Sequence, residues 1–333
     1  MAFGNNTLEP HSTSEIFKNK YGDCKDLSLL TMAMLKSVGI DSQTALFNTE
    51  YSINDPKYDL PIPSLFDHVL LLVKRDKGKD FYIDPLLDGY DIGQYPLAYQ
   101  GAWTFIITND GGRFDKFPIF DENKNHTGVN RIITIYEDGS ALIDSKAVWN
   151  LDSSIDMRRR IKALDKEEKD KFYEALDASL ASGGEMIEHK IEGAENKYGV
   201  IKPISKIKRK DEFPITDGMI IIDIPGFERD VDFTSKERKE PIFYAVNSLH
   251  EQTTIYRIPK GFKISHIPQN LNLDIGFFNI KREYTKGKNE VKVVETVRNK
   301  RIQLPKEDYP KVKDFFDQLP SKTQQRIIIK KSG

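Results

Sequence analysis

Apolar side chains recur at helical spacing in one early stretch of the chain. The positions concerned are Leu27, Leu30, Met34 and Val38. Such spacing places apolar groups on one face of a helix. Asp23 precedes the stretch as an N-cap, Asp26 follows three residues later as in a capping box, and Gly39 ends the run. The pattern predicts a helix over residues 24–38 that begins at Cys24.

Short runs of β-branched, aromatic and aliphatic residues follow this helix. They predict strands over residues 43–49, 66–74 and 80–84. The turn residues Lys77-Gly78-Lys79 join the last two runs into an antiparallel hairpin. Strand alternation then places His68 on the same face as Phe66, Leu70 and Leu72. The stretch 86–109, which mixes glycine, proline and aromatic residues, is expected to cover one side of this unit.

The second half of the chain has the turn-separated short strands that are typical of an antiparallel β-sandwich. A hairpin turn is expected at Glu137–Ser140, with Gly139 supplying the positive φ. Helices are expected over about 153–182 and 306–318. The basic run 206–210 is interpreted as a solvated loop beside Asp211 and Glu212. The expected strands are 186–192, 219–224, 242–246, 253–258, 264–267, 277–284, 290–297 and 325–330.

A chain of 333 residues accommodates more than one domain. The polar stretch 111–128 is the best candidate for a linker. We therefore expect an α+β protein with a first domain over 1–110 and a β-sandwich domain over 129–333 that carries the helices named above.

Composition narrows the possible functions. Fifty basic and 51 acidic residues leave a formal net charge of −1, which gives no case for binding nucleic acid or a membrane surface through global charge. No apolar run reaches the length of a membrane span, and the first twenty residues do not resemble a signal peptide. A single cysteine excludes an internal disulfide and a cysteine-based zinc site. The histidines have no metal-ligand spacing and no phosphate-binding glycine loop is present, so no metal or cofactor is expected.

Three residues along the first domain have the chemistry of a thiol enzyme. Cys24 lies at a predicted helix N-terminus, where unpaired N–H groups and the helix dipole favour the thiolate. His68 lies on a strand among apolar neighbours and can serve as the base. Asp84 ends the paired strand, where a carboxylate can hold the imidazole in one tautomer. The ordering Cys, His, Asp is that of papain-like enzymes.

Each of these residues also has a purely structural interpretation. A lone cysteine is often a small buried hydrophobic group. A strand histidine can be a hydrogen-bonded core residue, and an aspartate before a proline can be a turn former. Similarly, Tyr95, Tyr99, Trp103 and Phe105 fit core packing better than the wall of a substrate cleft. His11 has no pattern around it that marks a role.

The motifs Gly22-Asp23-Cys24-Lys25-Asp26, Phe66-Asp67-His68 and Tyr82-Ile83-Asp84-Pro85 resemble the transglutaminase-like superfamily. More narrowly, they resemble large bacterial proteins, common in Bacteroidetes and often exported, in which a transglutaminase-like core lies between two β-sandwiches. The resemblance implies Cys24 as nucleophile, His68 as general base and acid, and Asp84 as the orienting carboxylate. It also implies a papain-like core in which the helix bearing the cysteine packs on an antiparallel sheet.

One departure from the family concerns the start of the chain. Only 23 residues precede Cys24, where family members have a β-sandwich and the first helices of the core. We therefore expect both to be absent here, together with a side-chain donor to the oxyanion. Two hypotheses follow: a cysteine-dependent enzyme that cleaves amide bonds of a peptide or protein rather than crosslinking them, or a non-catalytic binding or scaffold protein with a degenerate form of the fold.

Overall fold

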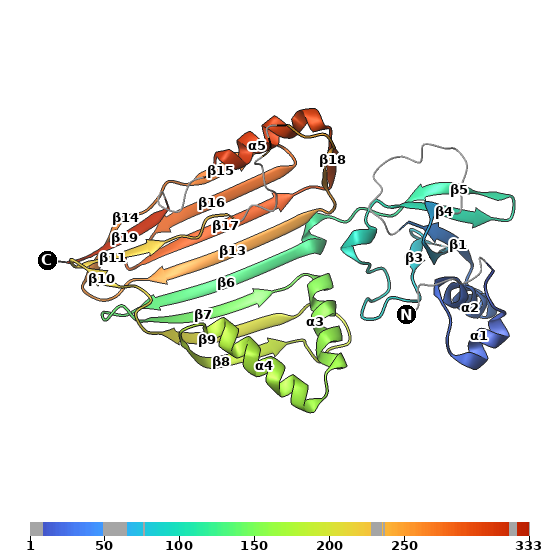
Figure 1. Cartoon of the computed structure of the whole chain (residues 1–333), viewed down its shortest axis with the longest axis horizontal. Coiled ribbons are helices and arrows are strands. Elements are labelled where there is room, and N and C mark those ends of the chain that lie inside the picture. Colours follow the sequence, from blue (N-terminus) through green and yellow to red (C-terminus); the bar gives the residue numbers. More distant parts are fainter. Residues whose placement is uncertain are drawn as a thin grey trace. The chain divides into compact units, whose positions relative to one another are not determined.

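The computed structural model describes residues 9–48, 65–75, 77–227, 235, 237–319 and 325–332. The chain divides into two compact units, Met1–Ile119 (the first unit) and Phe120–Gly333 (the second unit). Both combine helices with largely antiparallel sheets, so the protein is α+β as the sequence predicts (Figure 1). Within the part of the chain that the structure describes, no helix is long and apolar enough to cross a membrane.

The first unit contains a five-stranded antiparallel sheet with the order β3-β2-β1-β4-β5. Its strands are β1 (Ser42–Phe47), β2 (His68–Val73), β3 (Phe81–Ile83), β4 (Trp103–Thr108) and β5 (Gly111–Lys116). The predicted pairing of the second and third strands is present, with Leu71 opposite Ile83. A short 3₁₀ helix, η2 (Leu97–Tyr99), precedes β4.

Strands β4 and β5 lie where the sequence predicts a covering loop and a linker. Thr108 pairs with Gly111, so Asn109 and Asp110 form a two-residue turn between the strands. Gly112 lies against Phe105, and an added Cβ there would be 2.6 Å from the ring. Glycine-rich sequence therefore marks a tight hairpin here, because a linker and a hairpin turn require the same backbone freedom.

Two helices complete the first unit: α1 (Thr13–Asn19) and α2 (Cys24–Ser37). The beginning of α2 agrees with the sequence prediction, and the helix packs on β1 and β2. The Ser28 hydroxyl donates a hydrogen bond to the carbonyl of Val69 at 3.1 Å. The predicted apolar stripe is only partly covered, since Met34 and Val38 are 56% and 70% exposed. The first half of α2 is therefore its anchored half.

An eight-stranded sheet dominates the second unit, with the order β15-β16-β17-β13-β6-β7-β9-β8 (Figure 1). Its strands are β6 (His126–Ile135), β7 (Ala141–Val148), β8 (Glu185–Glu192), β9 (Lys202–Arg209), β13 (Ser248–Arg257), β15 (Leu271–Asp274), β16 (Phe278–Lys286) and β17 (Glu290–Asn299). A 3₁₀ helix, η3 (Glu122–Asn125), precedes it. All pairs are antiparallel except β6 with β13. That pair departs from the purely antiparallel expectation because a long connection, rather than a hairpin, separates its strands.

A four-stranded sheet packs on one face of the large sheet. It consists of β10 (Ile215–Thr216), β11 (Met219–Asp223), β19 (Arg326–Lys331) and β14 (Phe262–His266), in the order β10-β11-β19-β14. The core between the sheets includes Ile133, Tyr256 and Val293 from the large sheet and Ile222 and Ile329 from the small one. The β-sandwich expected from the sequence is thus present at this end of the unit.

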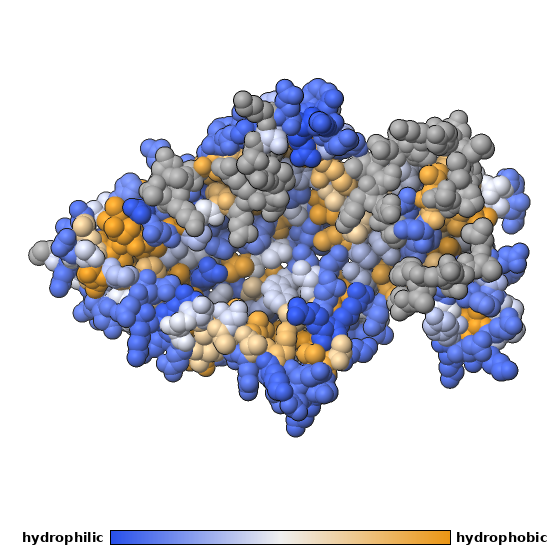
Figure 2. All heavy atoms as spheres, in the orientation of Figure 1, coloured by the Kyte–Doolittle hydropathy of each residue, from blue (hydrophilic) through white to orange (hydrophobic). Residues whose placement is uncertain are grey.

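A second apolar cluster lies under helix α5 (Tyr309–Asp317), which follows the 3₁₀ helix η4 (Lys306–Asp308). The cluster joins Phe315 and Phe316 of α5 to Phe278 of β16. A two-stranded sheet of β12 (Ile242–Tyr244) and β18 (Ile302–Leu304) also contributes. The opposite face of α5 is hydrophilic (Figure 2). The predicted final helix is therefore amphipathic and covers the sheet.

The long helix expected over 153–182 is two helices, α3 (Leu151–Ala163) and α4 (Lys166–Ala181). Leu164 has extended backbone, and the Asp165 side chain caps α4 by accepting from the N–H of Glu168. A capping box thus starts a new helix inside a continuous charged stretch. The basic run expected to be a loop also differs, because its first four residues lie in β9.

Candidate active site

Cys24 is the first residue of α2 and is partly buried. The Asp23 carboxylate caps the helix by accepting from the N–H groups of Lys25 at 3.1 Å and Asp26 at 3.2 Å. In turn, the Asp26 carboxylate accepts a hydrogen bond from the N–H of Asp23 at 3.3 Å. This capping box defines where the helix begins. It therefore holds the sulfur at the positive end of the helix dipole.

His68 begins β2, opposite Phe47 of β1, and is 6% exposed. The Phe47 ring meets the imidazole edge-on, with centroids 6.3 Å apart. Nε2 of His68 lies 2.7 Å from Oδ2 of Asp84. Because Nε2 is engaged by the carboxylate, Nδ1 is left for the sulfur.

Asp84 directly follows β3 and is 8% exposed. The register that pairs Leu71 with Ile83 brings Asp84 next to Leu70, on the strand face that also carries His68. The second carboxylate oxygen, Oδ1, accepts from the N–H of Leu86 at 2.9 Å. Both oxygens of this buried acid are therefore hydrogen-bonded, as a buried charge requires.

Hydrogen bonds among the three predicted residues also shift the pKa values of Cys24 and His68. A hydrogen bond with His68 lowers the pKa of the Cys24 thiol, against the opposing effect of burial, and the backbone of Val69 adds a smaller favourable bond. Burial alone would lower the pKa of His68, but hydrogen bonds to Asp84 and Cys24 raise it to about 9. Hydrogen bonding between the two residues therefore favours the thiolate of Cys24 and the imidazolium of His68.

Sequence reasoning missed one member of this group. The Tyr99 hydroxyl donates to Oδ2 of Asp84 at 2.7 Å, the same oxygen that His68 contacts. Its ring packs on Phe47 with centroids 4.6 Å apart. Burial, followed by the charge of Asp84, raises the pKa of Tyr99, so the hydroxyl remains a donor. No local pattern marks Tyr99, because it approaches Asp84 through the loop between β3 and β4.

The described residues contain no group of three or more histidine, cysteine, aspartate or glutamate side chains that could hold a metal ion. The arrangement at Cys24 has a different chemistry. A thiol, an imidazole and a carboxylate are linked in a hydrogen-bonded chain, an arrangement that can support covalent acyl transfer.

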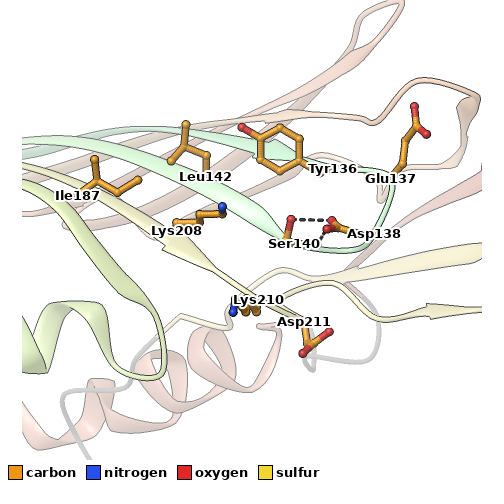
Figure 3. A pocket seen from close by; sticks show the side chains of 9 residues that line it. All are labelled: Tyr136, Glu137, Asp138, Ser140, Leu142, Ile187, Lys208, Lys210 and Asp211. Atoms are coloured by element: carbon orange, nitrogen blue, oxygen red, sulfur yellow. Dashed lines mark hydrogen bonds between the residues drawn. The ribbon is translucent and has the colours of Figure 1, made fainter.

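A separate pocket of about 870 Å³ lies in the second unit (Figure 3). It is formed at the β6–β7 turn and the neighbouring ends of β8 and β9. The lining residues are Tyr136, Glu137, Asp138, Ser140, Leu142, Ile187, Lys208, Lys210 and Asp211. The Asp138 carboxylate accepts hydrogen bonds from the hydroxyl and the N–H of Ser140, so it stabilises the turn. None of the residues predicted for catalysis lies in this pocket.

Comparisons with known proteins give two findings. Residues 218–329 match the model of a family described as a domain of unknown function with solved structure, DUF3858. A crystal structure of a "putative protease" from Parabacteroides distasonis aligns with a TM-score of 0.49 and 12% sequence identity. The alignment covers 96% of this chain and 46% of that protein, so this chain spans less than half of its length. No curated protein matches the sequence.

Proposed function

We propose that this chain is a transglutaminase-like thiol enzyme that cleaves amide bonds of a peptide or protein. The observation that carries the proposal is the hydrogen-bonded chain from Cys24 through His68 to Asp84, which starts at the capped N-terminus of α2. The helix packed on antiparallel β1 and β2, and the motif resemblance around all three residues, support the same class.

The proposed reaction begins when the Cys24 thiolate attacks the carbonyl carbon of the substrate amide. The negative charge moves to the carbonyl oxygen, and the N–H of Cys24, which has no partner within the helix at this first position, is placed to stabilise it. His68 then gives its proton to the leaving amine as the carbon–nitrogen bond breaks. The products of this half are a free amine and an acyl thioester on Cys24.

Water completes the proposed cycle. His68, now neutral, removes a proton from the water that attacks the thioester, and the carbon–sulfur bond breaks to give a carboxylic acid and the Cys24 thiolate. The acid releases its remaining proton to solvent as a carboxylate. The proton taken from water stays on His68, which restores the starting ion pair. Asp84 stabilises the imidazolium and maintains the ring orientation in both halves, with Tyr99 holding the carboxylate. Substitution of an amine for water would give transamidation, and we favour hydrolysis.

The reactivity of the thiol tests the proposal directly, because Cys24 is the only cysteine in the chain. The second-order rate of iodoacetamide alkylation should be measured by intact mass from pH 4 to 10 for the wild type, H68A and D84A. The wild-type profile should show a thiol pKa below its usual value, and H68A should return it towards that of a free thiol. D80A is the matched control, since Asp80 flanks the other end of β3 and its carboxylate accepts hydrogen bonds from Lys74 and Arg75 on the surface.

The opposite result would favour the second hypothesis, a non-catalytic binding or scaffold protein. A wild-type thiol that titrates like free cysteine, with no change in H68A, would remove the basis for catalysis. Thermal unfolding of each variant should accompany the kinetics, so that a lost signature is not mistaken for lost folding.

A further inference from the structure

Asp26 is the second aspartate of the Gly22–Asp26 motif and is 3% exposed. Helix capping needs only its bond to the N–H of Asp23. The carboxylate nevertheless has two further partners, both from the same residue of the lead-in segment. The backbone N–H of His11 donates to Oδ1 at 2.9 Å, and Nδ1 of His11 lies 3.0 Å from Oδ2.

These bonds tie the segment ahead of α1 to the first turn of α2. Ser12, the residue after His11, is the N-cap of α1, and Ile16 of that helix is 2% exposed. The close packing extends to Gly22, where an added Cβ would lie 2.6 Å from Cβ of Asp26 and 3.3 Å from Cγ2 of Ile16. Glycine is thus required at this position for space, since no positive φ is recorded for it.

Burial alone would raise the pKa of Asp26, yet hydrogen bonds from His11 and Asp23 lower it. The carboxylate is therefore a buried negative charge satisfied by donors from two separate parts of the chain. Breaking such an arrangement leaves an uncompensated buried charge, so the segment and the helix start are held together.

We propose that His11 and Asp26 form a clamp that positions the first turn of α2, so that the Cys24 sulfur stays within hydrogen-bonding reach of His68. The inference rests on the proposed function, because it assigns positioning residues to that site. Helix ends fray more readily than helix centres, and Cys24 is at the first position of its helix. Ser28 fixes the second turn to β2, and the clamp acts one turn earlier.

The test is the apparent pKa of Cys24 from iodoacetamide alkylation of the full chain. G22A displaces Asp26 without altering any charge, and H11A removes the ring contact from a side chain that is 65% exposed. Both variants should raise the thiol pKa, so that alkylation near pH 6.5 falls by up to about tenfold. S37A is the control, because the Ser37 hydroxyl donates to the carbonyl of Met34 near the other end of α2.

D26N separates positioning from simple charge. Removal of a nearby negative charge by itself lowers a thiol pKa, whereas loss of the clamp raises it. A rise in D26N therefore supports the clamp, and a fall overturns it. Unchanged profiles in G22A and H11A, beside a low wild-type pKa, would overturn the clamp and leave the proposed function standing. A wild-type thiol with no lowered pKa would overturn both.

If G22A does not fold, H11A and D26N still test whether the clamp positions Cys24. H11A alters a mostly exposed side chain, so folding is expected and is checked by thermal unfolding. A positioning role also predicts that H11N, whose side-chain amide can donate to Asp26, restores part of the wild-type profile. A thiol pKa in H11N no closer to the wild type than that of H11A would contradict the clamp.

Discussion

In the first unit the buried side chains of His68 and Asp84 form a hydrogen-bonded chain with a partly buried thiol, whereas in the second unit Arg282 is neutralised by Glu295 beside large apolar clusters. Arg282 is 1% exposed, donates from Nε to Glu295 and from Nη2 to the carbonyl of Pro225, and lies over the Phe227 ring.

The difference lies in what the buried charge can do. Glu295 accepts from Arg282 and from Gln252, and neither partner is a nucleophile or a general base. The histidine in the first unit can carry and release a proton, and it contacts a thiol. Buried polar networks of similar construction therefore serve structure in one unit and, we propose, catalysis in the other.

The largest expected effect comes from breaking the chain in the first unit. H68A should lower kcat/KM for hydrolysis of a fluorogenic peptide mixture by on the order of 10² to 10⁴, because the general acid and base is lost. C24A should abolish turnover. Measured hydrolysis by H68A at the wild-type rate would place the chemistry elsewhere.

The corresponding break in the second unit should affect stability. R282M leaves the largely buried carboxylate of Glu295 without its positive partner and should lower the free energy of unfolding by about 3–5 kcal/mol. The double variant R282M/E295M should recover most of this loss, because both charges are replaced by apolar groups of similar size. Urea unfolding of both variants measures the effect. If the double variant is as unstable as R282M, the ion pair contributes more to the free energy of unfolding than the two methionines that replace it.

The pH dependence separates thiol reactivity from turnover. As pH falls through the lowered pKa of Cys24, the thiolate is protonated and both alkylation and hydrolysis should decline by up to tenfold per unit. As pH rises through about 9, His68 loses the proton that the leaving amine needs, so hydrolysis should decline while alkylation stays high. Parallel alkaline limbs for the two rates would contradict the role of His68 as acid.

The smallest expected effect concerns Tyr99. Y99F removes one hydrogen bond to Asp84, worth about 0.5–1.5 kcal/mol, and should change the alkylation rate at neutral pH by only a few fold. Y95F is the matched control, because the Tyr95 hydroxyl bonds the backbone of Tyr82 instead of the carboxylate. Equal effects of Y99F and Y95F on alkylation would indicate general packing rather than support of Asp84.

Local signals in the sequence were sufficient for several elements. The start of α2 follows from Asp23 and Asp26, and the turn at Gly139, with φ of 82°, follows from its Asp-Gly pair. Strand β5 was mistaken for part of a linker and β4 for part of a covering stretch, because glycine-rich sequence is typical of linkers and of hairpin turns. The break at Leu164 was missed because the helical, charged pattern continues across it.

The features of the candidate site fall into two groups: those set by local sequence and those set by contacts between distant residues. Caps and strand alternation depend on a few neighbouring residues and on backbone periods, so the amino-acid order alone could indicate a cysteine at a helix start and a histidine on a buried strand face. The bonds of His11 to Asp26 and of Tyr99 to Asp84 each join residues fifteen positions apart. Such bonds, and the pKa values that follow from them, depend on how strands and loops pack and exclude water, which no local pattern encodes.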